Sequence, residues 1–188
     1  VLKVLINEYP APVELARFRQ EYELVRSLDI DGIPQFEDFG KLENRYFISM
    51  KDDGSVSLNH FLADKLLEIP DFLKIAIQLS EILGQLHRKG VIHRDLKPDN
   101  IFIQPDQLKV TISDFGLSTQ IQGEAPDQVL QGNWEGSLPY LSPERSGRMN
   151  RPVDYRSDFY ALGISFFEML TGRLPFLANS PLEWVHIH

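Results

Sequence analysis

The chain has 188 residues, of which 43% are hydrophobic and 24% are charged, a balance that is typical of one globular domain with an apolar core and that excludes a disordered chain. The formal net charge of −8 argues against a nucleic-acid partner. Cysteine is absent, so disulfides and thiolate metal sites are excluded and a cytoplasmic location is expected; no run approaches the roughly 20 apolar residues of a membrane span.

The chain begins with an apolar run, residues 1–6, which predicts a buried strand with Lys3 as the one cation inside it. For this lysine alone, an edge-strand position with its amine in solvent remains an alternative. Residues 10–28 follow, with prolines at the start and apolar side chains three or four residues apart. This spacing predicts a helix.

Four further stretches predict strands, in two pairs that are each joined by a turn: residues 33–39 and 45–50 around a turn at 40–44, and residues 101–103 and 110–112 around a turn at 105–106. The clearest helix is predicted for residues 71–88, with apolar side chains along one stripe. Another is predicted for residues 158–170, with Ser157 as its N-cap. Its core-facing residues are expected to be Phe159, Leu162, Phe166 and Met169.

Two polar motifs interrupt this pattern. Residues 93–100 read HRDLKPDN and follow the helix at 71–88, and residues 114–116 read DFG directly after a strand-like run. They bring a possible base, a cation, an amide and a second carboxylate close together along the chain. A solvated turn is the alternative for each residue taken singly, because Asp, Asn, Lys and Pro are common in turns. The ordered octet together with DFG is too specific for that alternative.

These motifs resemble the catalytic and metal-binding loops of eukaryotic-type serine/threonine protein kinases, whose pattern is H-R-D-L-x-x-x-N followed by D-F-G. The resemblance implies an α+β, bilobal, protein-kinase-like fold in one domain. Residues 1–50 would form a small β-rich N-lobe that lacks its first strands, and residues 51–188 the hinge and a mainly helical C-lobe that lacks its last helices. ATP would lie between the lobes.

The resemblance also assigns catalytic roles, with ATP and Mg²⁺ as cofactors. Asp95 would orient the substrate hydroxyl, and Lys97 would lie beside the transferred phosphate. Asn100 and Asp114 would bind Mg²⁺, which prefers oxygen ligands and takes the remainder from water and the nucleotide. Phosphoryl transfer needs mainly positioning and charge neutralisation from the protein, and these residue types supply both.

Further positions are expected to contact the nucleotide. Lys3 resembles the lysine of the V-A-I-K strand, which reaches the ATP phosphates and pairs with a glutamate of the next helix. Glu21 is the expected partner, in preference to Glu14 and Glu23. The back of the adenine pocket and the hinge would be formed by Met50, Lys51, Asp52 and Asp53.

Residues 117–144 resemble an activation segment that ends in Ser-Pro-Glu. Ser137 matches the threonine that contacts the catalytic aspartate and lysine in the family, and together with Lys97 it favours serine and threonine substrates. No Ser, Thr or Tyr lies between Thr119 and Ser137. In the family, the arginine at the position of Arg94 pairs with a phosphate on this segment. We therefore expect a fixed acid among Glu124, Asp127 and Glu135, with Glu135 or Asp127 preferred, to take that place. The alternatives are that the acids are solvated and Arg94 contacts only backbone, or that Ser118 or Thr119 is phosphorylated.

Residues 147–158 read GRMNRPVDYRSD and resemble the kinase domain at the head of large bacterial multidomain sensor kinases. Sensor and histidine kinase domains are thus expected as partners in the same protein. Because no G-x-G-x-x-G precedes Lys3, the chain is expected to be truncated at both ends and inactive as it stands. A pseudokinase or scaffold module is the alternative, although Lys3, Asp95, Asn100 and Asp114 are all present.

Overall fold

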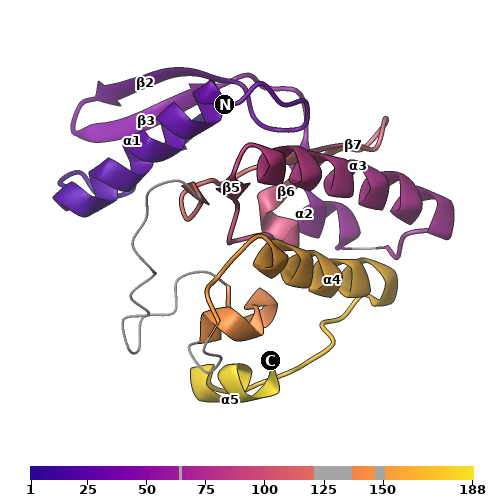
Figure 1. Ribbon diagram of the computed structural model, residues 1–188. Helices are drawn as coiled ribbons and strands as arrows, with labels where there is room; N and C mark the ends of the chain where they lie inside the picture. The colour runs from indigo at the N-terminus through magenta and orange to yellow at the C-terminus, as the bar shows by residue number, and fades with distance from the viewer. Residues whose placement is uncertain (64, 121–136, 147–150) are drawn as a thin grey trace.

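The computed structural model describes all residues except 64, 121–136 and 147–150. Its N-terminal part is an antiparallel three-stranded sheet with helix α1 (Pro12–Ser27) packed beneath it in Figure 1. The strands are β1 (Leu2–Val4), β2 (Phe36–Leu42) and β3 (Arg45–Met50), in the order β1-β3-β2.

Strand β1 differs from its prediction. It covers three residues, and Leu2 and Val4 are 56% and 42% exposed, whereas Lys3 is half-buried. Successive side chains of a strand point to opposite faces, so the inward position of Lys3 sends both neighbours outward. The prediction of a buried apolar strand is therefore wrong, and the lysine is the residue that faces the interior.

The hairpin of β2 and β3 is longer than predicted. Strand β2 continues to Leu42, which pairs with Arg45, so the turn comprises only Glu43 and Asn44. Gly40 lies inside the strand, where a Cβ would come within 2.6 Å of the Phe47 ring. The expected turn at 40–44 is wrong because this glycine makes room for a ring and does not form the turn.

The second part of the molecule is mainly helical. Helix α3 (Ile69–Arg88) confirms the helix predicted at residues 71–88, and its stripe of Ile75, Leu79, Ile82, Leu83 and Leu86 is buried. Each such side chain contributes about 1.5–3 kcal/mol through removal from water. Helix α4 (Arg156–Thr171) packs against α3, where the rings of Phe72 and Phe166 meet edge to face at 5.3 Å.

Short elements complete this part, among them the predicted hairpin at residues 101–112. They are β4 (Val56–Ser57), α2 (Leu58–Leu62), β5 (Val91–Ile92), η1 (Pro98–Asn100), β6 (Ile101–Gln104), β7 (Lys109–Ile112), β8 (Thr119–Gln120), η2 (Leu138–Tyr140), η3 (Pro143–Ser146) and α5 (Pro181–Ile187). Strands β4, β6 and β7 form one sheet, and β5 pairs with β8.

Helix α4 corrects two predictions. It begins before Ser157, whose hydroxyl donates to the Glu144 carboxylate and does not cap the helix. Phe159 is 48% exposed, and its ring lies against His87 and Tyr155 instead of facing the core. The inward position at this end of the helix belongs to the preceding residue, Asp158.

The two parts share one hydrophobic core. The loop after α1 joins them, because the Gly32 carbonyl accepts a hydrogen bond from the Ile112 backbone amide at 2.8 Å. Gly32 has φ of +96°, and a Cβ there would lie 2.3 Å from Ile82. The predicted α+β class is confirmed, and no helix among the described residues is long and apolar enough to cross a membrane.

Candidate active site

The loop at residues 93–100 is anchored by one buried carboxylate, that of Asp158 in α4. Its Oδ2 accepts from the His93 amide at 2.9 Å and from His87 Nε2 at 2.8 Å, and its Oδ1 accepts from the Arg94 amide at 2.8 Å. Asp158 is 1% exposed. Burial alone would raise the pKa of Asp158, but these hydrogen bonds hold it below its ordinary value. A charged carboxylate inside the fold therefore sets the path of the loop.

His93 connects this loop to the one that follows β7. Its Nε2 lies 3.1 Å from the Ser113 carbonyl, which can only accept, so Nε2 carries the proton. Its Nδ1 accepts from the Asp95 amide at 3.3 Å. Complete burial lowers the pKa of His93, and its ring packs edge-on against Phe115 at 4.9 Å. The neutral imidazole thus bridges the two loops.

The backbone is strained where the loops meet. Arg94 has φ of +70° and Asp114 has φ of +67°, in the left-handed region that costs a non-glycine residue about 1–3 kcal/mol. The carbonyl of Arg94 also accepts a hydrogen bond from the guanidinium of Arg145. The hydrogen bonds of the Arg94 amide to Asp158 and of its carbonyl to Arg145 hold this residue in the strained conformation.

The carboxylate of Asp95 is held on both oxygens. Oδ2 accepts from Asn100 Nδ2 at 2.9 Å and lies 3.1 Å from Lys97 Nζ. Oδ1 accepts from the Ser137 amide at 3.1 Å. Lys97 Nζ also donates to the Ser137 hydroxyl at 2.6 Å. The structure therefore brings Ser137, from far along the chain, to both Asp95 and Lys97, as expected.

Lys3 forms the second part of the site. Its Nζ lies 2.6 Å and 2.8 Å from the two carboxylate oxygens of Glu21 and 2.8 Å from Asp114 Oδ1. Glu21 Oε1 also accepts from the Phe115 amide at 3.2 Å. The predicted pair of Lys3 and Glu21 is present, and it reaches the DFG loop as well.

Burial differs within this network: the side chains of Glu21, Lys3 and Asp114 are 2%, 32% and 46% exposed. Burial lowers the pKa of Lys3, but the carboxylates of Glu21 and Asp114 outweigh it and raise the pKa overall. Burial raises the pKa of Asp114, yet Lys3 brings it below its ordinary value. For Glu21 burial dominates, and its pKa is raised. Glu14 and Glu23 form no ion pair with Lys3 in the described structure, which supports the choice of Glu21.

Asn100 and Asp114 offer a set of oxygen atoms that suits Mg²⁺. Both bonds of the Asn100 amide nitrogen go to Asp95, to its carbonyl at 2.7 Å and its carboxylate at 2.9 Å. The Asn100 side-chain oxygen is left as an acceptor. The Asn100 carbonyl accepts from the Ser113 amide at 2.8 Å, which keeps it beside Asp114. Within the described ranges no group of three or more His, Cys, Asp and Glu could hold a metal, so bound Mg²⁺ would need further oxygens from a nucleotide and water.

The expected hinge lies between β3 and β4. Met50 is half-buried at the end of β3, and Lys51, Asp52 and Asp53 are exposed. The carboxylates of Asp52 and Asp53 each accept from the backbone amide two residues further on. The Asp53 carbonyl accepts from Gln104 at 3.2 Å. The acidic side chains thus shape turns, and the backbone of this segment is what a nucleotide base could contact.

Three contacts around the site had no signal in the sequence. Gln104 ties the hinge segment to β6. Asn59 of α2 donates to Asp99 of the HRDLKPDN loop at 2.8 Å. The Tyr140 hydroxyl donates to Glu168 of α4. Each pair is far apart along the chain, and only a residue pattern shared between relatives could have linked its members beforehand.

The acids expected to pair with Arg94, which are Glu124, Asp127 and Glu135, lie outside the described residues. The proposed pairing therefore stays a prediction.

The comparisons with known proteins agree with this geometry. The family profile described as "Protein kinase domain" matches residues 1–187. The chain is 32% identical to serine/threonine-protein kinase pkn2 of Myxococcus xanthus, over 100% of this chain and 23% of the relative. It is 34% identical to serine/threonine-protein kinase PrkC of Bacillus subtilis, over 97% of this chain and 28% of the relative. It is 32% identical to the RAF proto-oncogene serine/threonine-protein kinase of Xenopus laevis, over 93% of this chain and 27% of the relative. The chain thus spans about a quarter of the length of these relatives.

Proposed function

The chain belongs to the protein kinase domain family, and from this premise we propose that the intact protein transfers the γ-phosphate of ATP to serine or threonine hydroxyls of protein substrates. The observation that carries the proposal is the set of donors around Asp95. Lys97, Asn100 and the Ser137 amide all reach its carboxylate. We assign residues 1–50 to the N-lobe and residues 51–188 to the hinge and C-lobe, with ATP between them.

Within this proposal Asp95 accepts a hydrogen bond from the substrate hydroxyl and orients it toward the phosphate. Its charge is balanced by Lys97 at 3.1 Å, whose amine would also contact the transferred phosphoryl group. Positioning of this kind is the main contribution that a protein makes to phosphoryl transfer. The amide of Asn100 holds the other side of the Asp95 carboxylate, so the orientation of Asp95 does not depend on the substrate.

Lys3 would contact the ATP phosphates while Glu21 keeps its amine in place. Asn100 and Asp114 would hold Mg²⁺, which supplies charge neutralisation to the phosphates when bound. Asp114 now accepts a hydrogen bond from Lys3 at 2.8 Å, and its carboxylate is half-exposed. It is therefore accessible to a cation, and the pKa of Asp114, which Lys3 lowers, keeps it ionised.

The preference for serine and threonine is supported by the contact of Lys97 with the Ser137 hydroxyl at 2.6 Å and by the names of the relatives. We retain the proposal that the protein acts in bacterial signal transduction, with Met50 and residues 51–53 at the adenine and further sensor domains as partners. Isolation of the intact protein with its flanking sequence identifies those domains directly.

The test of the proposed reaction is Asp95→Asn in the intact protein, with Asp106→Asn, an exposed aspartate in the turn before β7, as the matched control. We expect kcat for a serine-containing protein substrate to fall by about 10²- to 10⁴-fold in Asp95→Asn, the usual contribution of a positioned base. The ATP affinity of Asp95→Asn should stay near the wild-type value, and so should both the kcat and the ATP affinity of Asp106→Asn. A variant that loses ATP affinity but keeps its kcat contradicts the role of Asp95. Absence of phosphoryl transfer in the wild-type protein, with ATP binding intact, favours a scaffold.

A further inference from the structure

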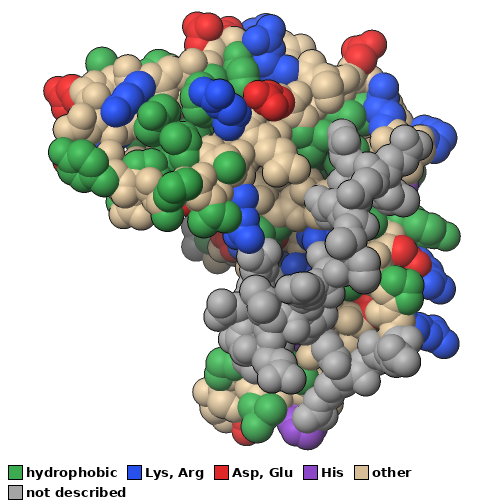
Figure 2. Space-filling view, turned by 60° about the vertical axis from the view of Figure 1, so that its left-hand side comes forward, with side chains coloured by type: hydrophobic (Ala, Val, Ile, Leu, Met, Phe, Trp, Pro, Cys, Tyr) green, Lys and Arg blue, Asp and Glu red, His purple; other side chains and the backbone are tan. Residues whose placement is uncertain are grey.

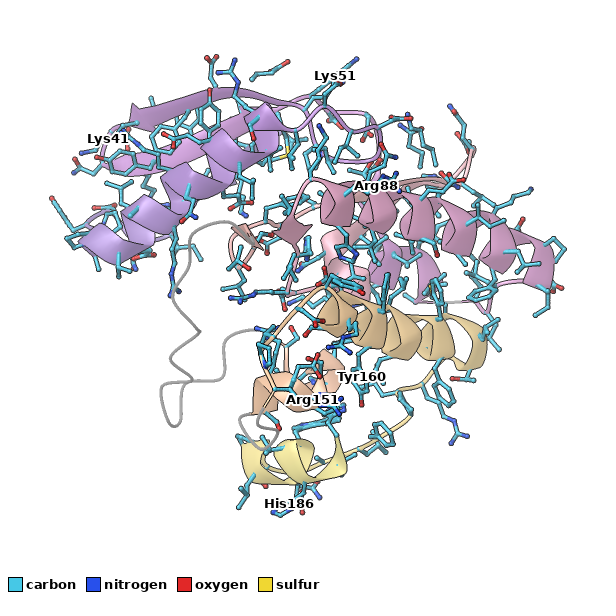
Figure 3. The ribbon with its side chains drawn as sticks, in the orientation of Figure 1. Lys41, Lys51, Arg88, Arg151, Tyr160 and His186 are labelled. Carbon is cyan, nitrogen blue, oxygen red and sulfur yellow. The ribbon has the colours of Figure 1, made fainter. Side chains whose placement is uncertain are left out.

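A histidine at the end of α5 connects two other elements of the helical part. His188 is the C-cap of α5, and its Nδ1 lies 2.8 Å from the Tyr160 hydroxyl of α4. Its Nε2 lies 3.0 Å from the Leu138 carbonyl of η2. Figure 3 labels Tyr160 between α4 and α5, and His186 at the outer edge of α5. The imidazole of His188 therefore joins α4 to η2 through two hydrogen bonds.

Three aromatic side chains fix the orientation of this imidazole. Trp184, one turn earlier in α5, stacks on it at 5.6 Å with an angle of 17° between the rings. The rings of Phe176 and Tyr160 meet it edge to face at 5.5 Å and 5.6 Å. Figure 2 shows hydrophobic and histidine side chains at the lower end of the molecule, where α5 lies in Figure 1. The side chain of His188 is half-buried, so it is held in place and still exchanges protons with solvent.

The two hydrogen bonds define the protonation state of His188. The Leu138 carbonyl can only accept, so Nε2 carries the proton and Nδ1 accepts from the Tyr160 hydroxyl. This is the neutral imidazole. Burial lowers the pKa of His188, although the hydrogen bond to the Leu138 carbonyl opposes this decrease. Protonation would put a proton on both nitrogens, so the Tyr160 hydroxyl could no longer donate to Nδ1.

The elements around His188 carry few other titratable groups in the part of the chain that the structure describes. On α4 it is Tyr160, whose pKa is raised by burial and then by the Glu144 carboxylate of η3. On η2, Tyr140 donates its hydroxyl to a carboxylate of α4. On α5, Glu183 accepts from a backbone amide before the helix at 2.6 Å. Both tyrosines stay neutral near pH 7, so His188 is the group of this contact that changes charge as pH falls.

The element that His188 contacts leads into the candidate active site. Helix η2 directly follows Ser137, whose amide lies 3.1 Å from Asp95 Oδ1 and whose hydroxyl lies 2.6 Å from Lys97 Nζ. A substrate hydroxyl bound to Asp95 lies beside Ser137, so the neighbouring residues of the peptide meet the segment that begins there. The proposed contacts of ATP lie on other elements. The position of η2 should therefore affect the peptide more than the nucleotide.

We propose that His188 is a positioning residue for the peptide substrate, and that its neutral form holds η2 against α4 whereas protonation releases this hold. The inference rests on the proposed kinase function. When the contact is lost, Asp95 keeps its bonds to Lys97 and Asn100 and therefore its orientation. The expected signature is a higher KM for the peptide, with little change in kcat or in the KM for ATP.

The test compares three variants of the intact protein. His188→Phe keeps an aromatic ring and removes both hydrogen bonds. His188→Gln keeps an amide that can donate to Leu138 but does not titrate. His186→Gln, the matched control, removes an exposed histidine from the same helix. Each is assayed with a serine peptide that contains no histidine, at pH values on both sides of the ordinary histidine pKa of about 6.5.

Above that pH we expect the peptide KM to rise about 2- to 13-fold in His188→Phe, the effect of one lost hydrogen bond. The increase should be smaller in His188→Gln and absent in His186→Gln. The wild-type peptide KM should rise as pH falls below about 6.5, because a histidine whose pKa is lowered by folding loses its contribution as pH falls through the folded value. His188→Gln should lack this additional rise.

Hydrogen–deuterium exchange of the protein without substrate gives a second measurement that needs no activity. Faster exchange at residues 138–141 in His188→Phe, with residues 93–100 unchanged, supports the contact with η2. An unchanged peptide KM in His188→Phe overturns the inference. So does an equal increase in His186→Gln, or the same pH profile for wild type and His188→Gln. If the wild-type protein transfers no phosphate, the proposed function fails, and exchange still decides whether His188 holds η2.

Discussion

The two loops that meet at the site are held by different means. The HRDLKPDN loop depends on Asp158, a fully buried carboxylate whose partners are two backbone amides and a histidine of the same helical part. Asp114 instead depends on Lys3, a half-exposed cation that comes from a strand of the N-terminal sheet. One loop is fixed within a single part of the fold, and the other is bound across two parts.

This difference indicates which loop can respond to its surroundings. Hydrogen bonds in a dry interior are strong, and their loss leaves unpaired groups that cannot reach water. A half-exposed ion pair is weakened by solvent and by salt, and it can exchange partners. We therefore expect the path of the HRDLKPDN loop to persist whenever the helical part is folded. The contact of Lys3 with Asp114 should change with ligand, pH and ionic strength.

The largest expected effect comes from removal of the buried anchor. Asp158→Ala leaves two amides and one imidazole without their acceptor, and it should lower the free energy of unfolding by about 3–5 kcal/mol. The control is Asp154→Ala, which removes a partly exposed partner of Arg156 and should cost at most about 1 kcal/mol. Denaturant unfolding followed by circular dichroism measures both. Similar losses in the two variants would mean that the Asp158 anchor contributes no more than a surface ion pair.

The ion pair across the two parts should have an intermediate effect. A double-mutant cycle with Lys3→Met and Glu21→Gln is expected to show a coupling of about 0.5–3 kcal/mol, the range for side chains in direct contact. The cycle should be repeated at high salt, where we expect a smaller coupling because Lys3 is partly exposed. Additive effects at low salt would mean that the pair contributes no interaction energy.

A smaller effect is expected from the Ser137 hydroxyl. Under the proposed function, Ser137→Ala in the intact protein removes the acceptor of the Lys97 hydrogen bond, which should cost about 0.5–1.5 kcal/mol in transition-state stabilisation, or roughly 2- to 13-fold in kcat/KM. Ser137→Thr keeps the hydroxyl and serves as the matched control. Steady-state kinetics with a peptide substrate distinguishes them. Equal kcat/KM for the two variants would show that the hydroxyl at this position does not contribute to the reaction.

The smallest expected effect is a difference in pH dependence between the two regions. The pKa of Asp158 is lowered by folding, so its contribution is complete above the unfolded value of about 3.9 and is lost as pH falls through the folded value. The pKa of Lys3 is raised, so its contribution is complete below the unfolded value of about 10.4 and is lost as pH rises through the folded value.

Stability curves measured against pH test this difference. Asp158→Asn should flatten the acid limb relative to wild type, and Lys3→Met should flatten the alkaline limb. Removal of Lys3 also changes the pKa values of Asp114 and Glu21, but carboxylates titrate far below the alkaline limb, so that limb still reports on Lys3. An unchanged limb in either variant would show that the corresponding pKa is not shifted by folding.

The sequence by itself determined the parts of this protein that depend on local pattern. The stripe of α3 and the hairpin of β6 and β7 follow from the spacing of apolar residues and from turn residues between them. The resemblance to the kinase family, counted back from the end of the helix, predicted Glu21 in preference to Glu14 and Glu23, and Glu21 is the glutamate that binds Lys3. The HRDLKPDN and DFG motifs predicted the candidate site because the order and spacing of their residues can be read from the sequence without knowing how the loops fold.

Only the tertiary structure decided which side chain takes each inward position. A strand has two faces, and either face of β1 could have pointed inward. Lys3 points inward because its carboxylate partners lie on α1 and after β7. The exposure of Leu2 and Val4 therefore could not be predicted from the residues of β1 alone. At the start of α4, Ser157 suits an N-cap, yet its hydroxyl meets Glu144 of a neighbouring segment. A polar side chain can bond either its own helix or strand neighbours or a group from another segment. In both cases here the group that it bonds comes from another segment, which only the tertiary structure shows.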